Sequence, residues 1–238
     1  MKFPKRFEAD RIAEGLDPWL AYAEDARYYI ERFSRLFPEI AHTPERLARI
    51  RAEGGHPLVV DLCGTAEATS IGAEHTIGFT LTQPENRENT ATRTIVVGDI
   101  FTSGGVERVA ESIRAHGGSF HCLFFRPVGG LGGFETHLRA HVRLYAALQR
   151  LYPLLAEDGE MYIELPGYRG AKLLADILNA QSAEPFCTAI IEEREHGGPR
   201  TTARIHKTEG APKALKSLDE LNAIPGLTER LVETMDKE

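Results

Sequence analysis

The stretch PLVVDLCGT, Pro57 to Thr65, decides the fold class of this chain, because an apolar run ends in an acid and a turn of small residues follows at once. Leu58, Val59 and Val60 show no polar alternation, which is typical of a strand buried on both faces of a parallel sheet. A tight turn then leads into residues 67–74, which we expect to form a short helix. Such a turn lets a ligand approach the backbone and meet the helix N-terminus.

Strand-like runs alternate with helical patterns downstream of this stretch. The expected strands cover residues 58–62, 76–81, 94–97, 120–125 and 161–165, and the expected helices between them cover residues 105–116, 135–151 and 171–179. Two further strand-like runs, 186–195 and 200–207, are joined by a glycine-containing loop and predict a hairpin. The alternation predicts an α/β fold, a mostly parallel sheet with helices on both faces and a C-terminal antiparallel hairpin.

The first 55 residues are expected to form a helical N-terminal extension. Apolar residues at helical spacing predict a helix over residues 19–37, with Asp17 as its cap and Pro18 in its first turn. A second helix is expected over residues 43–53. The chain then divides into the extension (1–55), an α/β sheet domain (56–208) and a C-terminal tail (209–238). The tail either forms short helices or lies loosely on the surface.

Composition and charge narrow the class of protein. Of the 238 residues, 42% are hydrophobic and 26% are charged, which is ordinary for a soluble globular protein. The net charge of −7 argues against broad nonspecific nucleic-acid binding. Three widely spaced cysteines predict buried free thiols in a reducing cytoplasm. We expect no secretory signal, no membrane span and no dedicated metal site, while an oligomer is compatible with the sequence.

Three local patterns, in this order, resemble the class I S-adenosylmethionine-dependent methyltransferases. VVDLCGT resembles the first motif of that family, a strand that ends in an acid before a glycine loop. TIVVGDIF resembles the third-strand motif, whose acid lies beside the adenine. LYPLLAEDGEMYIELP resembles the helix-turn-strand segment before the fifth strand. The resemblance covers about residues 58–207 and implies a Rossmann-like fold, S-adenosylmethionine as cofactor, and methyl transfer to a small-molecule or protein acceptor.

The resemblance also implies a cofactor site at the carboxyl ends of the first three strands, made by Asp61, Cys63, Gly64, Thr80, Asp99 and Ile100. Asp61 either anchors the cofactor loop through backbone N–H groups or caps the turn that follows it. Asp99 either accepts a hydrogen bond from the adenine amino group or caps the next turn. Both alternatives stay open for each residue.

The substrate side is expected after the fourth strand. Arg126 ends that strand, where it could bind a substrate carboxylate or phosphate, or pair with Glu135. His137 is the second substrate-side candidate. It shares a helix face with His141, so the two could together bind a metal or one could act as a general base, although such histidines are more often surface residues. Glu164 lies inside the fifth strand and points either toward the cleft or toward a helix layer. Tyr22, Tyr28 and Tyr29 either line a lid or pack the first helix.

Departures from the family pattern leave two classes of function. The loop is one residue shorter than the family form, Ala66 stands where its last glycine would fall, and Thr80 stands where an acid would bind the ribose. These departures favour a non-catalytic methyltransferase-like binding or scaffolding protein. The retained Asp61, Gly64 and Asp99 favour the enzyme, which is our working hypothesis; the catalytic residue and the acceptor are unknown at this point.

Overall fold

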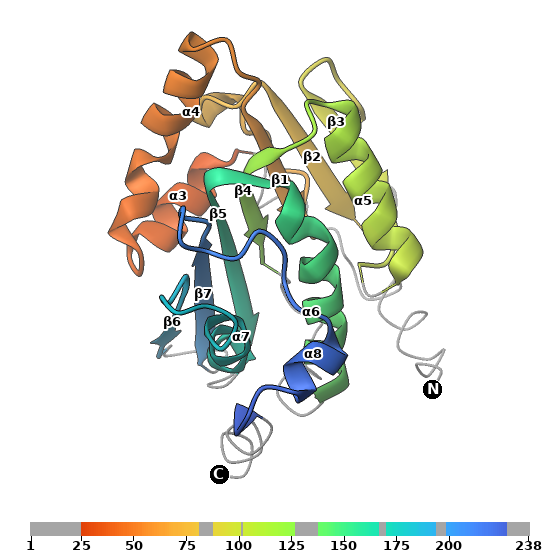
Figure 1. Cartoon of the computed structure of the whole chain (residues 1–238). Coiled ribbons are helices and arrows are strands. Elements are labelled where there is room, and N and C mark those ends of the chain that lie inside the picture. Colours follow the sequence, from red (N-terminus) through yellow and green to blue (C-terminus); the bar gives the residue numbers. More distant parts are fainter. Residues whose placement is uncertain are drawn as a thin grey trace.

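Seven strands form one sheet in a computed structural model that describes residues 25–80, 88–100, 102–126, 138–166, 170–193 and 199–227. The strands are β1 (Leu58–Leu62), β2 (His75–Thr80), β3 (Arg93–Val97), β4 (Phe120–Phe125), β5 (Leu155–Pro166), β6 (Cys187–Glu192) and β7 (Arg200–His206). Their order is β3-β2-β1-β4-β5-β7-β6 (Figure 1). Neighbours among β1 to β5 are parallel, whereas β7 runs antiparallel to both β5 and β6. The predicted fold class is therefore confirmed.

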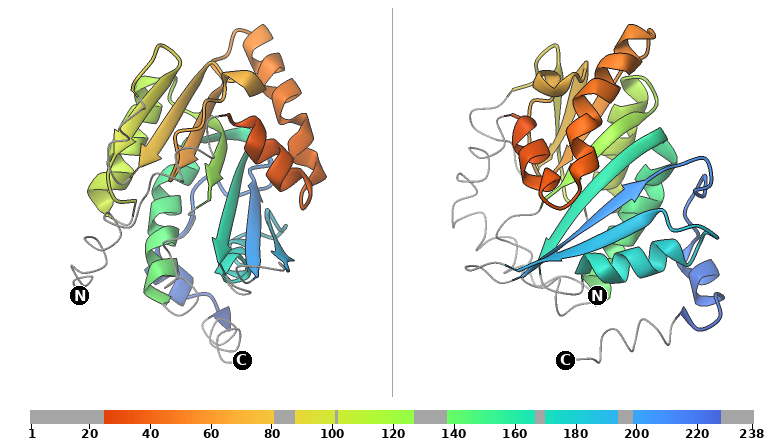
Figure 2. Two further views of the ribbon diagram at one scale, coloured as in Figure 1. Left: turned by 180° about the vertical axis from the view of Figure 1, so that it is seen from behind. Right: turned by 90° about the vertical axis from the view of Figure 1, so that its left-hand side faces the viewer.

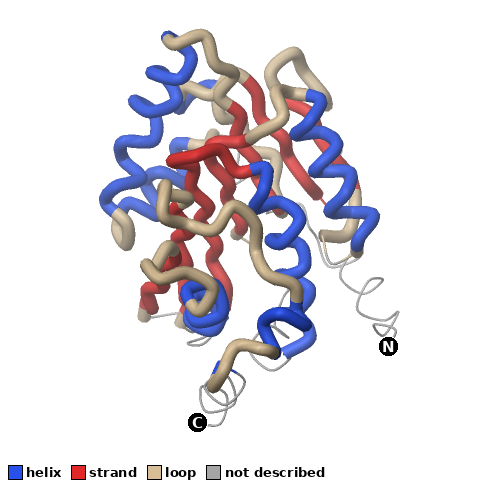
Figure 3. The backbone as a smooth tube through the Cα atoms, viewed as in Figure 1, coloured by secondary structure: helices blue, strands red, loops and turns tan. Residues whose placement is uncertain are grey.

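Helices cover both faces of this sheet (Figures 2 and 3). One face carries α3 (Arg27–Ser34), η1 (Pro38–His42) and α4 (Thr43–Ala52), and the other carries α5 (Ser103–Ala115), α6 (Leu138–Leu151) and α7 (Gly170–Asn179). We call the first the α3 face. Its apolar cluster joins Phe33 and Leu47 of the helices to Val59, Phe124 and Tyr162 of the strands, all buried. Alternate strand residues therefore bury apolar side chains on both faces, as the unbroken apolar runs predict.

The connection from β1 to β2 differs from the expectation. The helix predicted over residues 67–74 is wrong, because only a single 3₁₀ turn, η2 (Thr69–Ile71), forms there. The α3 face above this segment is already covered by helices that precede β1. Ala66, Ala68 and Ile71 pack beneath them in the same cluster, and the backbone N–H of Ala26 donates to the carbonyl oxygen of Glu67 at 2.8 Å.

Two other expected elements change their bounds. The fifth strand begins at Leu155 rather than at residue 161, with Asp158 in the left-handed region at φ 60° and a register shift opposite Phe120 and Cys122. The first helix is shorter than residues 19–37, since Asp25 pairs in a β-bridge with Glu67. The predicted start at residues 17–18 lies outside the described part of the chain.

The described part of the C-terminal tail packs on the sheet domain. A short helix, α8 (Leu218–Asn222), begins with a capping box in which Ser217 and Glu220 bond reciprocally. Leu215, Leu221 and Leu227 are buried in the apolar cluster on the side of α5 to α7. Of the two alternatives for the tail, residues up to 227 therefore take the first, a short helix.

Candidate functional site

The carboxyl ends of β1, β2 and β3 bring the six predicted cofactor residues to one edge of the sheet. The parallel registers place Leu62 opposite Phe79, and Thr80 opposite Val97, so that the three strands end side by side. The backbone N–H of Cys63 donates to the carbonyl oxygen of Phe79, and that of Gly98 donates to the carbonyl oxygen of Thr80, both at 2.8 Å. The structure therefore groups the residues; it does not test their roles.

The loop after β1 is wound around the side chain of Asp61. This carboxylate is fully buried and accepts hydrogen bonds from the backbone N–H of Ala66 at 2.8 Å and from the hydroxyl of Tyr29 at 3.0 Å. A Cβ atom on Gly64 would stand 2.2 Å from its Oδ2, so only glycine fits there. The bond to Ala66 is the turn cap that the sequence offers as one alternative for Asp61.

The same loop lies against the end of β2. Cys63 adopts φ 75°, in the left-handed region, and its N–H donates to the carbonyl oxygen of Phe79 at 2.8 Å. A Cβ atom on Gly78 would lie 2.8 Å from the carbonyl oxygen of Gly64, so this contact needs glycine at position 78. Residues 64–66 are buried, whereas Cys63 is half-buried. Cys63 is therefore the loop residue with the most solvent-accessible surface.

The residues at this edge suit the nucleoside half of S-adenosylmethionine better than its amino-acid half. Asp99 is half-buried and its carboxylate accepts from amino or hydroxyl groups, and Thr80 adds a hydroxyl, whereas Ile100 is buried in the core beneath them. In the described residues, however, the loop leads only into the three-residue η2, so no helix N-terminus follows it.

Arg126, the predicted substrate residue, follows β4 at the same edge. Its Nε donates to Oε1 of Glu164 at 3.3 Å, its Nη1 donates to the hydroxyl of Tyr28, and its guanidinium lies 5.1 Å from the centre of the Tyr28 ring. The suggested partner Glu135 lies outside the described residues. So do His137 and the side chain of His141.

Glu164 is the centre of an ionic cluster that the sequence does not reveal. It is fully buried on the α3 face, and it accepts from Arg32 at 2.7 Å and from Arg200 at 3.1 Å as well as from Arg126. Arg32 also pairs with Glu192. Of its two predicted directions, Glu164 takes the one toward a helix layer. The available signals were an acid inside a buried strand, which needs a partner, and the helical spacing of Tyr29, Arg32 and Phe33.

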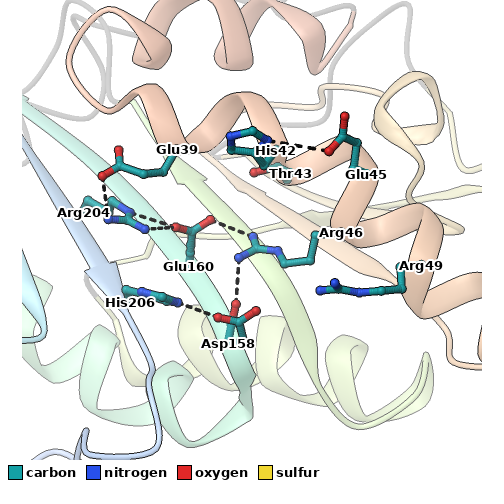
Figure 4. A pocket seen from close by; sticks show the side chains of 10 residues that line it. All are labelled: Glu39, His42, Thr43, Glu45, Arg46, Arg49, Asp158, Glu160, Arg204 and His206. Atoms are coloured by element: carbon teal, nitrogen blue, oxygen red, sulfur yellow. Dashed lines mark hydrogen bonds and ion pairs between the residues drawn. The ribbon is translucent and has the colours of Figure 1, made fainter.

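A second ionic cluster lines a pocket of about 490 Å³ between α4 and the strands β5 and β7 (Figure 4). The buried carboxylate of Glu160 lies 2.8 Å from Arg46 and 2.6 Å from Arg204. Asp158 accepts from His206 at 2.7 Å. These acids and bases largely satisfy one another, so the pocket marks the junction that holds α4 on the sheet.

The buried Asp61 predicts a specific pH dependence of stability. Burial raises its pKa from 3.8 to about 6, and the bonds from Ala66 and Tyr29 oppose this rise. The folded state therefore keeps a proton that the unfolded state has lost, and the stability contributed by this group falls as pH rises from about 4 to about 6. The wild type should therefore lose about 2 to 3 kcal/mol of stability over that window, and Asp61→Asn should not, because asparagine does not titrate. Urea unfolding of both proteins across this pH range measures the difference. A pH-independent difference would contradict the buried, shifted carboxyl.

The described residues hold no cluster of three or more potential metal-ligating side chains, and none of their helices is long and apolar enough to span a bilayer. Cys63, Cys122 and Cys187 are free thiols, and the latter two are buried.

The sequence matches no protein-family model and no curated protein. Among solved structures, a ribosomal RNA methyltransferase from Plasmodium falciparum has a TM-score of 0.46 at 7% identity, over 71% of this chain and 97% of that one. The MycE methyltransferase of the mycinamycin pathway, solved with Mg and SAH, has a TM-score of 0.41 at 13% identity, over 83% of this chain and 55% of that one. The N-methyltransferase NodS from Bradyrhizobium japonicum WM9 has a TM-score of 0.40 at 12% identity, over 72% and 98%. The strand order with an antiparallel β7, observed directly here, is the Rossmann-like methyltransferase fold that the sequence resemblance implies.

Proposed function

We propose that this chain is an S-adenosylmethionine-dependent methyltransferase whose cofactor lies over the carboxyl ends of β1, β2 and β3. The observation that supports this most is the loop wound around Asp61, next to Thr80 and Asp99 at the same edge. The cofactor supplies an already activated methyl group. The protein then needs mainly to orient the acceptor and exclude water, so a strong catalytic constellation is not required.

Each residue at the edge has a part in this proposal. Asp61 holds the loop, Cys63 is the accessible loop residue beside the nucleoside, and Gly64 and Ile100 support it from beneath. Asp99 accepts from the adenine amino group, and the Thr80 hydroxyl bonds one ribose hydroxyl. On the other side of the loop, Arg126 faces the substrate, and we assign His137, which lies outside the described residues, to the same role.

The extension, residues 1–55, supplies α3 over the carboxyl ends of β1 and β4, where it would cover the cleft and select a small-molecule or protein acceptor. The sheet domain, residues 56–208, carries the cofactor, and the tail, residues 209–238, supports it through its described part, which packs on the core up to Leu227. Three free thiols suit a reducing compartment such as the cytoplasm.

Binding of S-adenosylhomocysteine, the demethylated cofactor, tests the proposal directly. At 100 times its dissociation constant, a ligand specific for the folded state stabilises it by about 2.7 kcal/mol, which should raise the melting temperature by several degrees. A melt that does not move would reject the enzyme. It would leave the non-catalytic binding or scaffolding protein, which the short loop and Thr80 favour.

Asp99→Ala should weaken S-adenosylhomocysteine binding about 2- to 12-fold, because a hydrogen bond contributes about 0.5 to 1.5 kcal/mol. Calorimetry with the inosine analogue, which lacks the adenine amino group, checks the contact, since the variant should bind that analogue as the wild type does. Equal losses for the two ligands would argue against a direct bond. Asp219→Ala, on the exposed side of α8, is the matched control and should change neither affinity.

A further inference from the structure

The amino-acid end of the proposed cofactor carries a carboxylate, and the loop after β1 has no helix N-terminus to receive it. We propose that the guanidinium of Arg126 binds this carboxylate in place of a helix N-terminus. The inference rests on the proposed function and adds to it a positioning residue directly after β4, the strand next to β1.

Arg126 lies at the right place along the edge. Leu62 of β1 is opposite Phe125 of β4, so the residue after each, Cys63 and Arg126, leaves the sheet beside the other. Arg126 also points to the α3 face, where it meets Tyr28. Burial and the Asp61 charge raise the pKa of Tyr29 well above its ordinary value, and the charge of Arg126 opposes this rise. The guanidinium is therefore within electrostatic reach of the Tyr29–Asp61 pair.

The guanidinium of Arg126 is held in a fixed orientation, and one of its nitrogen atoms has no partner among the described residues. Glu164 accepts from its Nε and Tyr28 accepts from its Nη1, which fixes the plane of the group. Its Nη2 makes no hydrogen bond or ion pair with any described residue, and the side chain is 13% exposed. A guanidinium presents five N–H donors in a planar fork suited to a carboxylate. An oriented donor loses less entropy when it binds.

The charges around Arg126 favour an anion. Arg126 is one of three arginines around Glu164, together with Arg32 and Arg200. A carboxylate that approaches this group of guanidinium charges is attracted to it, and the Nη2 group of Arg126, unused by the described residues, is a donor suited to such a ligand. A carboxylate on the acceptor has the same chemistry, and the experiment below distinguishes it from that of the cofactor.

Two ligands isolate the contact: S-adenosylhomocysteine and its decarboxylated form, S-adenosyl-3-thiopropylamine, which keeps the amine and the nucleoside. Calorimetry on the full chain should show the wild type binding the first about 10- to 100-fold more tightly, as for a charge-assisted hydrogen bond. Arg126→Gln should bring the two affinities together, mainly by weakening S-adenosylhomocysteine. Arg126→Lys keeps the charge and should keep part of the difference.

The control is Arg200→Gln, which removes a donor to the same oxygen of Glu164 but lies on β7, away from β1. It should leave the wild-type ratio of the two affinities unchanged. Equal affinity of the wild type for both ligands, or an unchanged ratio in Arg126→Gln, would overturn the inference while the proposed function stands; the acceptor's carboxylate would then be the better partner for Arg126. If neither ligand binds the wild type, the proposed function itself fails, and the inference with it.

Discussion

Glu164→Gln is expected to lower the free energy of unfolding by about 3 to 5 kcal/mol, because it removes one partner from a buried ionic cluster. The carboxylate is fully buried and pairs with Arg32, Arg126 and Arg200. The glutamine has nearly the same shape, so the change tests charge rather than packing. Urea unfolding at neutral pH measures it as a shift of the midpoint with an unchanged slope.

An exposed ionic pair provides the comparison. Glu107 pairs with Arg114 and Arg150 on the surface, where solvent screens the interaction, so Glu107→Gln should move the midpoint little. If Glu164→Gln also left the midpoint unmoved, the three arginines would not depend on this carboxylate, and the cluster would not hold α3 on the sheet.

Phe33→Ala, made alone in the wild type, is expected to lower the free energy of unfolding by about 3 to 5 kcal/mol. The reason is that it removes a fully buried aromatic side chain from the core. Its ring stacks on Tyr162 at 5.6 Å and on Phe124 at 6.3 Å between ring centroids. α3 has only eight residues, too few to be stable alone, so tertiary packing holds it. Urea unfolding gives the loss, and hydrogen exchange should show faster exchange in α3 than in α5.

Ile191→Ala is the matched apolar truncation, because Ile191 is 44% exposed on the edge strand β6. It should lose much less stability than Phe33→Ala. Equal losses from the two variants would mean that the aromatic stack on the α3 face contributes no more than surface apolar contacts.

Buried strands are the part of this fold that local sequence pattern predicts best. β1 and β4 match their expected bounds, because each is an apolar run enclosed on both faces. The helix expected at residues 67–74 fails for a reason that no local pattern contains. The α3 face there is covered by helices from before β1, so the connection needs no helix of its own. Tertiary cover overrides a local propensity in this case.

In the candidate site, too, the local pattern predicts some features, whereas others depend on tertiary contacts. Placing Asp61, Thr80 and Asp99 at strand ends was enough to predict that they share an edge, since parallel strands end together. The bonds from Tyr29 to Asp61 and from Arg32 to Glu164 cross 32 and 132 residues of chain, respectively. Such long-range pairs follow from how α3 sits on the sheet, which one sequence does not specify.

The long separation between α3 and its partners has a consequence for synthesis on the ribosome. Arg32 emerges 132 residues before Glu164, an interval of roughly 7 to 26 s at ordinary elongation rates. Until β4 and then β5 have been made, the apolar stripe and the arginine of α3 lack the strands that receive them. β1 and β2 can pair soon after they are made, because the connection between them is short. The contacts on the α3 face can form only after most of the chain has been made. Nascent chains stalled before β5 should therefore expose Phe33 to proteases and chaperones, and chains stalled after β7 should protect it.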